Sequence, residues 1–254
     1  MAYGAMARAA KGERGGRGRR RRGEEGATPR RRIRPIRWLF GWIFRLALLA
    51  VVLLFAALGA YAVIDPPTTP YMLQERQRLG ALQHEWVDME EIAPVMARAA
   101  VAAEDANFCL HWGLDLDAIR IALEAGATRG ASTISQQTVK NVYLWQGRSW
   151  LRKSLEAGIT PLMEVIWSKE RILEVYLNMI EFGPGIFGVG AAAEHYFGKP
   201  AANLTAGEAA RLAAVLPSPQ TRDAANLTTM MLRRAASIQD GAATIAGDGR
   251  AACF

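Results

Sequence analysis

The sequence predicts a mostly α-helical domain behind a single N-terminal membrane-spanning helix. Two observations support this fold class. An uncharged apolar run of nineteen residues extends from Leu46 to Ile64. The residues after it carry repeated helix-start and helix-stop signals and no long alternating strand pattern. A chain of 254 residues has room for one core of ordinary size plus appendages.

The apolar run matches the thickness of a bilayer core. At the helical rise per residue it covers about 28 Å. Aromatic residues of the kind found at membrane interfaces precede it: Trp38, Phe40, Trp42 and Phe44. We therefore expect a transmembrane helix over residues 38–64. A cleaved signal peptide is the alternative, because Ala60-Tyr61-Ala62 fits a cleavage site, but the 45 residues ahead of the run far exceed a usual n-region.

The basic charge of the chain lies in its N-terminal tail. Residues 1–37 contain twelve Arg and one Lys against three Glu, so this segment carries +10 and the rest carries −3 of the chain's +7. This distribution argues against nucleic-acid binding by the main domain. Arginines beside a membrane span stay on the cytoplasmic side. We therefore expect a solvated, disordered cytoplasmic tail, and binding of anionic lipid is a second role for its arginines. We expect the domain after Asp65 to lie on the outer side of the cell inner membrane.

The rest of the chain is divided by turn and capping signals. PPTTP at residues 66–70 predicts a stiff stalk within an entry segment over residues 65–87. Thr205 and Glu208 form a capping-box pattern. Predicted helices cover 94–104, Asp115 or Asp117 to Gly126, Ser132 or Thr133 onward, 150–167 with a kink at Pro161, 169–179, 188–197, and Thr205 to the residue before Pro217. Residues 220–254 lose periodicity, so we expect a partly disordered C-terminal segment.

The two cysteines predict neither a disulfide framework nor a metal site. Cys109 stands between Phe108 and Leu110 and has the pattern of a small buried apolar residue. Cys253 is next to last in the sequence, and we expect it to be mobile.

Two glutamates are candidates for catalysis. Glu104 ends an apolar helix, where partial desolvation raises the pKa of a carboxyl and suits it to proton transfer; the alternative is a surface acid at a helix end. Glu156 shares a helix face with Arg152, and its alternative is a routine surface ion pair. Five cations gather within thirty residues and could bind a diphosphate: Lys140, Arg148, Arg152, Lys153 and Lys169.

Four motifs follow one another over 75 residues. They are ED-x-x-F-x-x-H-x-G from Glu104, G-x-S-T-I-x-Q-Q-x-x-K-N from Gly130, R-K-x-x-E from Arg152 and K-x-x-I-L-E-x-Y-L-N from Lys169. In this order they resemble the family 51 glycosyltransferases, the peptidoglycan transglycosylases. The resemblance covers about residues 88–219, and residues 181–199 look like the monofunctional branch, so we expect no penicillin-binding transpeptidase domain.

The resemblance implies a lysozyme-like α fold that polymerises lipid II into glycan strands for cell wall biogenesis, with inversion and release of undecaprenyl diphosphate. Glu104 would be the general base. Glu156 would assist near the donor diphosphate, directly or through a divalent ion such as Mg²⁺ or Mn²⁺, and no organic cofactor is implied. The residues implied in substrate binding are Asp105, Phe108, His111, Ser132, Thr133, Gln136, Gln137, Lys140, Asn141, Arg148, Arg152, Lys153, Lys169 and Asn178.

Two other functions compete with this interpretation. A lytic enzyme on the same fold would cleave peptidoglycan, but it has no diphosphate to bind with a cation cluster. A non-catalytic anchored module would leave the four motifs without a purpose. The expected partners are lipid II, the growing strand and the membrane, with cell-division or penicillin-binding proteins as further candidates and no nucleic acid.

Overall fold

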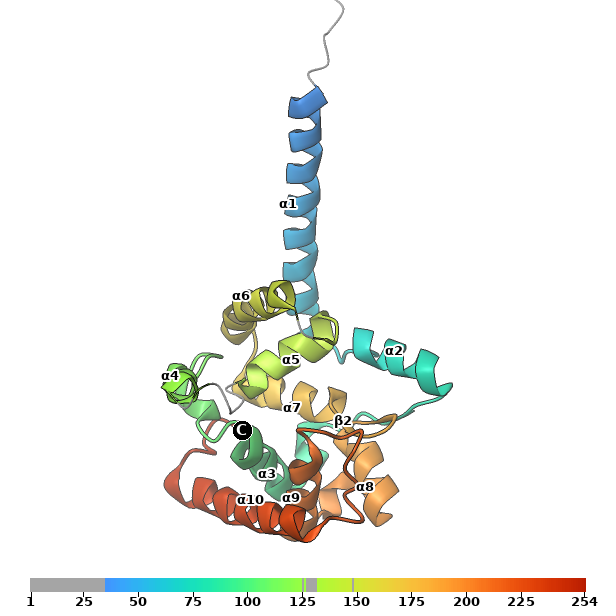
Figure 1. Ribbon diagram of the computed structural model, residues 1–254, viewed down its shortest axis with the longest axis vertical. Helices are drawn as coiled ribbons and strands as arrows, with labels where there is room; N and C mark the ends of the chain where they lie inside the picture. Colours follow the sequence, from blue (N-terminus) through green and yellow to red (C-terminus); the bar gives the residue numbers. More distant parts are fainter. Residues whose placement is uncertain (1–34, 125, 127–131, 148) are drawn as a thin grey trace, which may run out of the picture. The chain divides into compact units, whose positions relative to one another are not determined.

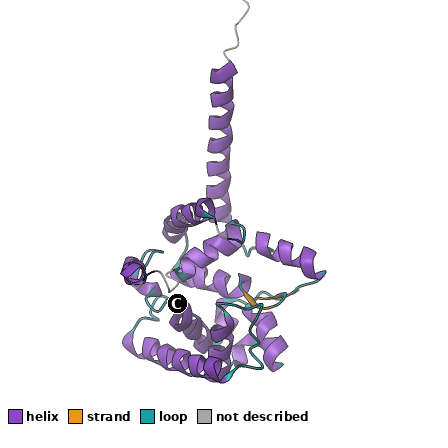
Figure 2. Ribbon diagram, viewed as in Figure 1, coloured by secondary structure: helices purple, strands orange, loops and turns teal. Residues whose placement is uncertain are grey.

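The computed structural model describes residues 35–124, 126, 132–147 and 149–254. The described chain is mostly helical, as predicted (Figures 1 and 2). It divides into two units, residues 1–48 and residues 49–254. The basic tail predicted over residues 1–37 lies, up to residue 34, outside the described residues.

Helix α1 spans Pro35–Tyr61. Within it, Ile36–Tyr61 is the one described helix long and apolar enough to cross a membrane. This finding fits the predicted single-pass anchor, and the observed bounds differ from residues 38–64 by two or three residues at each end. Helix ends are commonly uncertain by this amount.

The last turns of α1 belong to the larger unit. The Leu58 side chain is fully buried there. Trp167 donates its indole N–H to the Leu58 carbonyl at 2.7 Å, and Arg171 Nε donates to the Tyr61 carbonyl at 3.1 Å. Because cleavage after Ala62 would remove both Leu58 and Tyr61, these contacts favour a retained anchor over a cleaved signal peptide.

Nine further helices lie in the larger unit, counted over the described residues. Their bounds are α2 Pro70–Leu79, α3 Pro94–Glu104, α4 Leu116–Glu124, α5 Ile134–Tyr143, α6 Trp150–Ile166, α7 Lys169–Met179, α8 Val189–Phe197, α9 Ala206–Val215 and α10 Thr229–Asp248. Short 3-10 turns cover Met89–Glu91, Phe108–Leu110 and Ala201–Asn203. The buried core includes residues of α7, where Leu173 and Tyr176 are almost fully buried.

Capping residues set several helix starts. The predicted capping box of Thr205 with Glu208 is confirmed. Of the two predicted caps Ser132 and Thr133, the cap of α5 is Thr133, which also forms a capping box with Gln136. Asp115 accepts the Ala118 N–H at 2.8 Å, so it caps α4 in preference to Asp117. The predicted stalk is shorter than expected, because Thr69 caps α2 and Pro70 is the first residue of that helix.

A small sheet joins segments far apart in the sequence. Its strands are β1 Gln83–His84, β2 Glu181–Gly183 and β3 Ile186–Phe187, in the order β1-β3-β2. Strand β3 pairs in parallel with β1 and antiparallel with β2. Strands of two or three residues are too short to show an alternating pattern, which is why the sequence did not indicate them.

Two expectations about the C-terminal segment are wrong. Residues 229–248 form helix α10, which buries a stripe at helical spacing: Met231, Ala235, Ile238, Ala242 and Ile245. Two of the five stripe residues are alanines, so the stripe was weak as a sequence signal. Cys253 is not mobile but bonded to Cys109, across a sequence separation of 144. The two described cysteines thus form a disulfide that spacing alone did not predict.

Candidate active site

Glu104 is the last residue of α3, and its side chain is half-buried. Its Oε2 accepts a hydrogen bond from Gln137 Nε2 of α5 at 2.9 Å. Burial raises the pKa of the Glu104 carboxyl, and the Gln137 hydrogen bond and the charges of Arg234 and Lys140 oppose this shift. A raised pKa in a carboxylate that still has cations nearby is typical of a group that takes up and releases a proton.

The residue after Glu104 fastens the first motif to the second. The Asp105 carboxylate accepts from His111 Nε2 at 2.9 Å and from the Ile134 N–H at the start of α5 at 3.0 Å. Thr133 Oγ1 donates to the Gly113 carbonyl at 2.6 Å. These side chains are buried or nearly so. Asp105, His111 and Thr133 therefore hold the loop beside Glu104, and direct substrate contact by them stays a prediction.

The glycine that ends the first motif lies against α6. Gly113 has a φ of +81°, which favours glycine, and a Cβ built there would lie 2.6 Å from Thr160 Cγ2 and 3.0 Å from Glu164 Cγ. Any larger residue would push the loop away from the helix that carries Glu156. The H-x-G spacing thus allows close packing between the segments that carry the two candidate glutamates.

The alternative interpretation of Glu156, a routine ion pair on the surface, is wrong. Its side chain is 3% exposed, and its two oxygens contact Arg152 Nη1 at 2.5 Å and Lys153 Nζ. Lys153 Nζ also lies 3.0 Å from Ser132 Oγ of the second motif. The second glutamate is therefore held between two cations, and one of them reaches across to the segment that precedes α5.

The charges of both glutamates act on Lys140. Burial lowers the pKa of its ammonium, and the carboxylates of Glu156 and Glu104 oppose that shift. Lys140, Gln137 and Asn141 share one face of α5 because they are three and four residues apart. Asn141 accepts from Gln146 at 3.2 Å. Among the described residues, no hydrogen bond engages Lys140 Nζ.

Two hollows flank this row of polar groups. One, of about 200 Å³, is lined by Glu104, Asp115, Ser132 and Thr133 among others. The other, of about 280 Å³, is lined by Ser149, Trp150, Arg152 and Lys153. The Ser132–Lys153 contact links the two. The site therefore has a carboxylate end and a cationic end.

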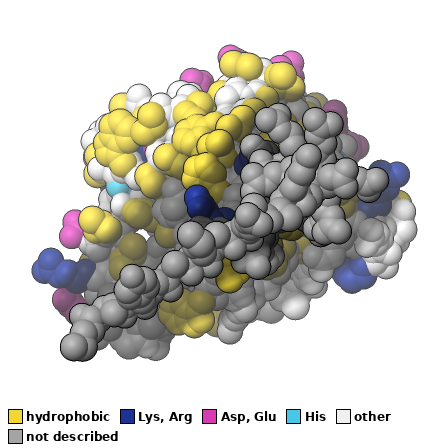
Figure 3. Space-filling view, turned by 90° about the horizontal axis from the view of Figure 1, so that it is seen from above, with side chains coloured by type: hydrophobic (Ala, Val, Ile, Leu, Met, Phe, Trp, Pro, Cys, Tyr) yellow, Lys and Arg dark blue, Asp and Glu magenta, His cyan; other side chains and the backbone are white. Residues whose placement is uncertain are grey.

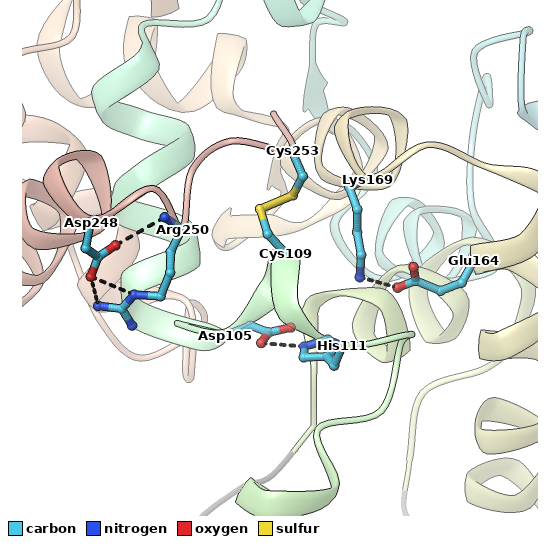
Figure 4. Close-up of a disulfide and its surroundings, with 8 residues drawn as sticks. All are labelled: Asp105, Cys109, His111, Glu164, Lys169, Asp248, Arg250 and Cys253. Carbon is cyan, nitrogen blue, oxygen red and sulfur yellow. Dashed lines mark hydrogen bonds and ion pairs between the residues drawn. A yellow bond between two sulfur atoms is a disulfide. The ribbon is translucent and has the colours of Figure 1, made fainter.

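Other predicted site residues lie in the protein framework. Lys169 pairs with Glu164 at 2.8 Å (Figure 4). Its Nζ lies 4.4 Å from the centre of the fully buried Phe108 ring. The Gln136 amide is used in the capping box of α5. The amide of Asn178 bonds to the Val87 backbone through its oxygen and its nitrogen. Arg148 lies outside the described residues.

Two residues that the sequence did not indicate as site residues, Arg234 and Asp115, act on or lie near Glu104. The charge of Arg234 on α10 lowers the pKa of Glu104. The Arg-Arg pair at 233–234 was visible in the sequence, but its distance from the motifs gave no reason to bring it to Glu104. Asp115 lines the hollow at Glu104. The ligand atoms of Asp105, His111 and Asp115 lie within 4.8 Å of one another.

Comparison with known proteins identifies the family of the chain. The transglycosylase family model matches residues 72–243, a range wider than the four motifs. A biosynthetic peptidoglycan transglycosylase of Jannaschia sp. (strain CCS1) is 60% identical over 218 residues, 86% of this chain and 90% of that protein. A protein of the same name in Xanthomonas campestris pv. campestris (strain B100) is 46% identical over 242 residues, which cover 89% of this chain and 95% of that protein. Another, in Pectobacterium carotovorum subsp. carotovorum (strain PC1), is 52% identical over 195 residues, which cover 72% of this chain and 80% of that protein. The chain therefore belongs to the transglycosylase family.

Proposed function

We propose that this protein is a peptidoglycan glycosyltransferase that polymerises lipid II into glycan strands and releases undecaprenyl diphosphate. The observation that carries the proposal is the pairing of a desolvated glutamate, Glu104, with a cationic end built from Arg152 and Lys153 around Glu156. A polymerase of lipid-linked sugars needs a base at the acceptor and positive charge at the leaving diphosphate.

The reaction follows from the two ends of the site. The Glu104 carboxylate takes the proton from the 4-hydroxyl of the acceptor sugar. The hydroxyl oxygen forms a bond to the anomeric carbon of the lipid-linked donor while the bond from that carbon to the diphosphate oxygen breaks. Attack from the face opposite the diphosphate inverts the anomeric configuration. Arg152, Lys153 and Lys140 stabilise the negative charge that grows on the leaving group.

The surroundings of Glu156 favour direct action of side chains at the diphosphate. Both oxygens of this carboxylate already contact cations, so a divalent ion placed there would face two positive charges. We propose that Glu156 orients Arg152 and Lys153 toward the phosphates. Removal of divalent ions by a chelator is then expected to leave binding of the diphospholipid intact, and loss of that binding would assign the metal an essential part.

The anchor and the surface of the domain suit a substrate that stays in the bilayer. Helix α6 exposes Trp150, Leu151 and Val165, and α4 exposes Leu116 and Ile121. Hydrophobic side chains gather on the face shown in Figure 3, with Lys and Arg side chains among them. Contiguous exposed apolar surface marks contact with a membrane or with another protein, and a membrane suits a lipid-linked substrate. Trp150 also lines the cationic hollow, which would bring the polyprenyl chain and the diphosphate to neighbouring places.

We propose that the domain lies in the periplasm, anchored in the inner membrane with the N-terminus in the cytoplasm. The arginines before α1 support this orientation through the positive-inside rule. The Cys109–Cys253 disulfide supports it independently, because such bonds persist in oxidising compartments and are rare in the cytosol.

The test is polymerisation of labelled lipid II by the full chain in detergent. We expect glycan polymer and undecaprenyl diphosphate to form together, without inhibition by penicillin. Pre-formed strands offered to the same preparation should stay intact. Cleavage of those strands without polymer synthesis would replace the proposal with the lytic alternative, and an absence of both activities would favour the non-catalytic module.

A further inference from the structure

The C-terminal segment contacts the chain both before and after Glu104. Helix α10 packs along α3, the helix that ends at Glu104 (Figure 1). The two backbones approach closely at Gly241, because a Cβ built there would already lie 3.4 Å from the Ala102 Cβ. This contact lies two residues before Glu104.

The six residues after α10 contact the loop that follows Glu104. Cys253 is bonded covalently to Cys109 (Figure 4). The rings of Phe254 and Phe108 lie with their centres 6.2 Å apart. Arg250 Nη1 donates to the Ala106 carbonyl at 3.3 Å. Arg250 is itself fixed by Asp248, which accepts from Arg250 Nε at 2.8 Å. Three separate contacts therefore join this tail to residues 106–109.

Glu104 occupies a place that needs such support. It is the last helical residue of α3, and Asp105 after it leaves helical geometry with φ −161° and ψ 70°. Helix ends fray unless the chain beyond them is held. Asp105 anchors one side of the loop through the Ile134 N–H, and the tail anchors the other.

We propose that residues 249–254 are a covalently latched positioning element for Glu104, and that the disulfide makes turnover depend on the thiol redox state. The proposal rests on the general-base role of Glu104 proposed above. The tail does not touch substrate in this scheme. It holds the 105–110 loop, and the loop holds the direction in which the Glu104 carboxylate faces the acceptor hydroxyl. An error of about 1 Å in such a group can cost on the order of a hundredfold in rate.

The redox step is a dithiol exchange. A dithiol reductant gives two electrons and two protons to the Cys109–Cys253 bond, which breaks into two thiols, while the reductant closes to its own cyclic disulfide. Oxidation by a disulfide-bearing protein or small disulfide reverses the exchange. The reduced enzyme keeps the Arg250 and Phe254 contacts but loses the covalent link between α10 and the catalytic loop.

The experiment compares the full chain with a Cys109→Ser/Cys253→Ser variant in lipid II polymerisation, well below the unfolding midpoint. We expect kcat to fall by about ten- to a hundredfold and KM for lipid II to change less than twofold. Dithiothreitol should bring the wild type to the same kcat and leave the variant unchanged, and reoxidation should restore the wild type. Circular dichroism should show equal helix content.

A double-mutant cycle separates positioning from general weakening. The Glu104→Gln variant lacks the group that the tail positions, so reductant should cost it less than twofold in residual rate. If reductant lowers the residual rate of the Glu104→Gln variant by the same factor as it lowers the wild-type kcat, the disulfide acts on something other than Glu104. This result would overturn the proposal. An unchanged kcat in the reduced wild type, with only a lower melting temperature, would overturn it as well.

A second variant, which keeps the disulfide, tests the proposal even if the cysteine variant does not fold. Arg250→Ala removes the contact to the Ala106 carbonyl and should lower kcat by about two- to fivefold in the same direction, as loss of one hydrogen bond would. A wild-type kcat in this variant and after reduction would leave the tail without a positioning role. Failure of the proposed function is seen separately, because the oxidised wild type would then form no polymer.

Discussion

The amide of Gln137 donates to the Glu104 carboxylate at 2.9 Å, and this hydrogen bond joins the second motif to the first across the active site. Gln137 stands on α5 one turn before Lys140, whose charge also lowers the pKa of Glu104. Gln137 and Lys140 of the second motif thus both lower the pKa of the Glu104 carboxyl. Burial of Glu104 opposes them by raising its pKa.

Replacing Glu104 with Gln should remove the base while keeping its size. We expect polymerisation to slow by about 10²–10⁴-fold, the usual value of general-base catalysis. Binding of lipid II should persist, because the cationic end of the site is untouched. The measurement is polymer formed per unit time by protein of normal helix content. A folded variant working at near the wild-type rate would move the base to another residue.

The same substitution makes a prediction about stability. The pKa of Glu104 is raised in the folded state, so the wild type loses stability as pH rises from about 4.5, the ordinary value, through that raised pKa. The Gln variant has no such loss. Its melting temperature should therefore equal that of the wild type in acid and exceed it at neutral pH. A variant less stable than the wild type at neutral pH would show that the ionised carboxylate stabilises the fold.

Gln137→Met should shift the pH dependence of turnover. The Gln137 hydrogen bond lowers the pKa of Glu104, so its loss raises that pKa further. Because the base must be ionised, the acid limb of the kcat/KM profile should move to higher pH, with a modest loss of rate at neutral pH. The profile measured from acid to neutral pH tests this. A loss of rate that is equal at every pH would indicate that Gln137 contacts substrate instead.

Lys153→Ala should weaken the cationic end of the site. Lys153 contacts Glu156 and lies 3.0 Å from Ser132 Oγ, so its removal leaves Glu156 with Arg152 alone. We expect roughly a tenfold loss of affinity for a diphospholipid, in line with a charge-assisted contact, and a fall in turnover. Arg76→Ala, at an exposed position on α2, is the matched control. Unchanged binding in the Lys153 variant would reduce the cluster to a structural role.

Gly113→Ala should destabilise the fold at the junction between the first motif and α6. The φ of +81° and the 2.6 Å approach to Thr160 Cγ2 both oppose a side chain at this position. We expect a loss of about 1–3 kcal/mol, measured by denaturant unfolding. Gly207→Ala is the control, since its Cβ would meet nothing nearer than 3.8 Å. Equal stability of the two variants would contradict the packing argument.

The orientation of the chain can be tested in cells. A reporter that is active only in the periplasm, fused after Phe254, should give signal. The physical reason is the arginine-rich segment before α1, which resists transfer across the membrane. A cytoplasmic reporter at the same place should stay silent. The opposite pattern would reverse the topology and would leave the disulfide in a reducing compartment.

The sequence by itself determined the features that depend on local order along the chain. The uncharged run placed α1, and the Thr205–Glu208 box placed the start of α9, because caps and hydrophobicity act between near neighbours. The spacing of the motifs also identified Glu104 and Glu156 as candidates. These features need no knowledge of how distant segments meet.

Only the tertiary structure showed which of the polar side chains have partners within the protein. Asp105 and Asn178 carry polar groups that look equally suited to substrate, yet their partners are His111, Ile134 and the Val87 backbone. Helix α10 escaped notice because its buried stripe is rich in alanine, and the Cys109–Cys253 bond joins residues 144 apart. Such contacts depend on the packed fold, where burial, charge and proximity come from segments that the sequence keeps far from one another.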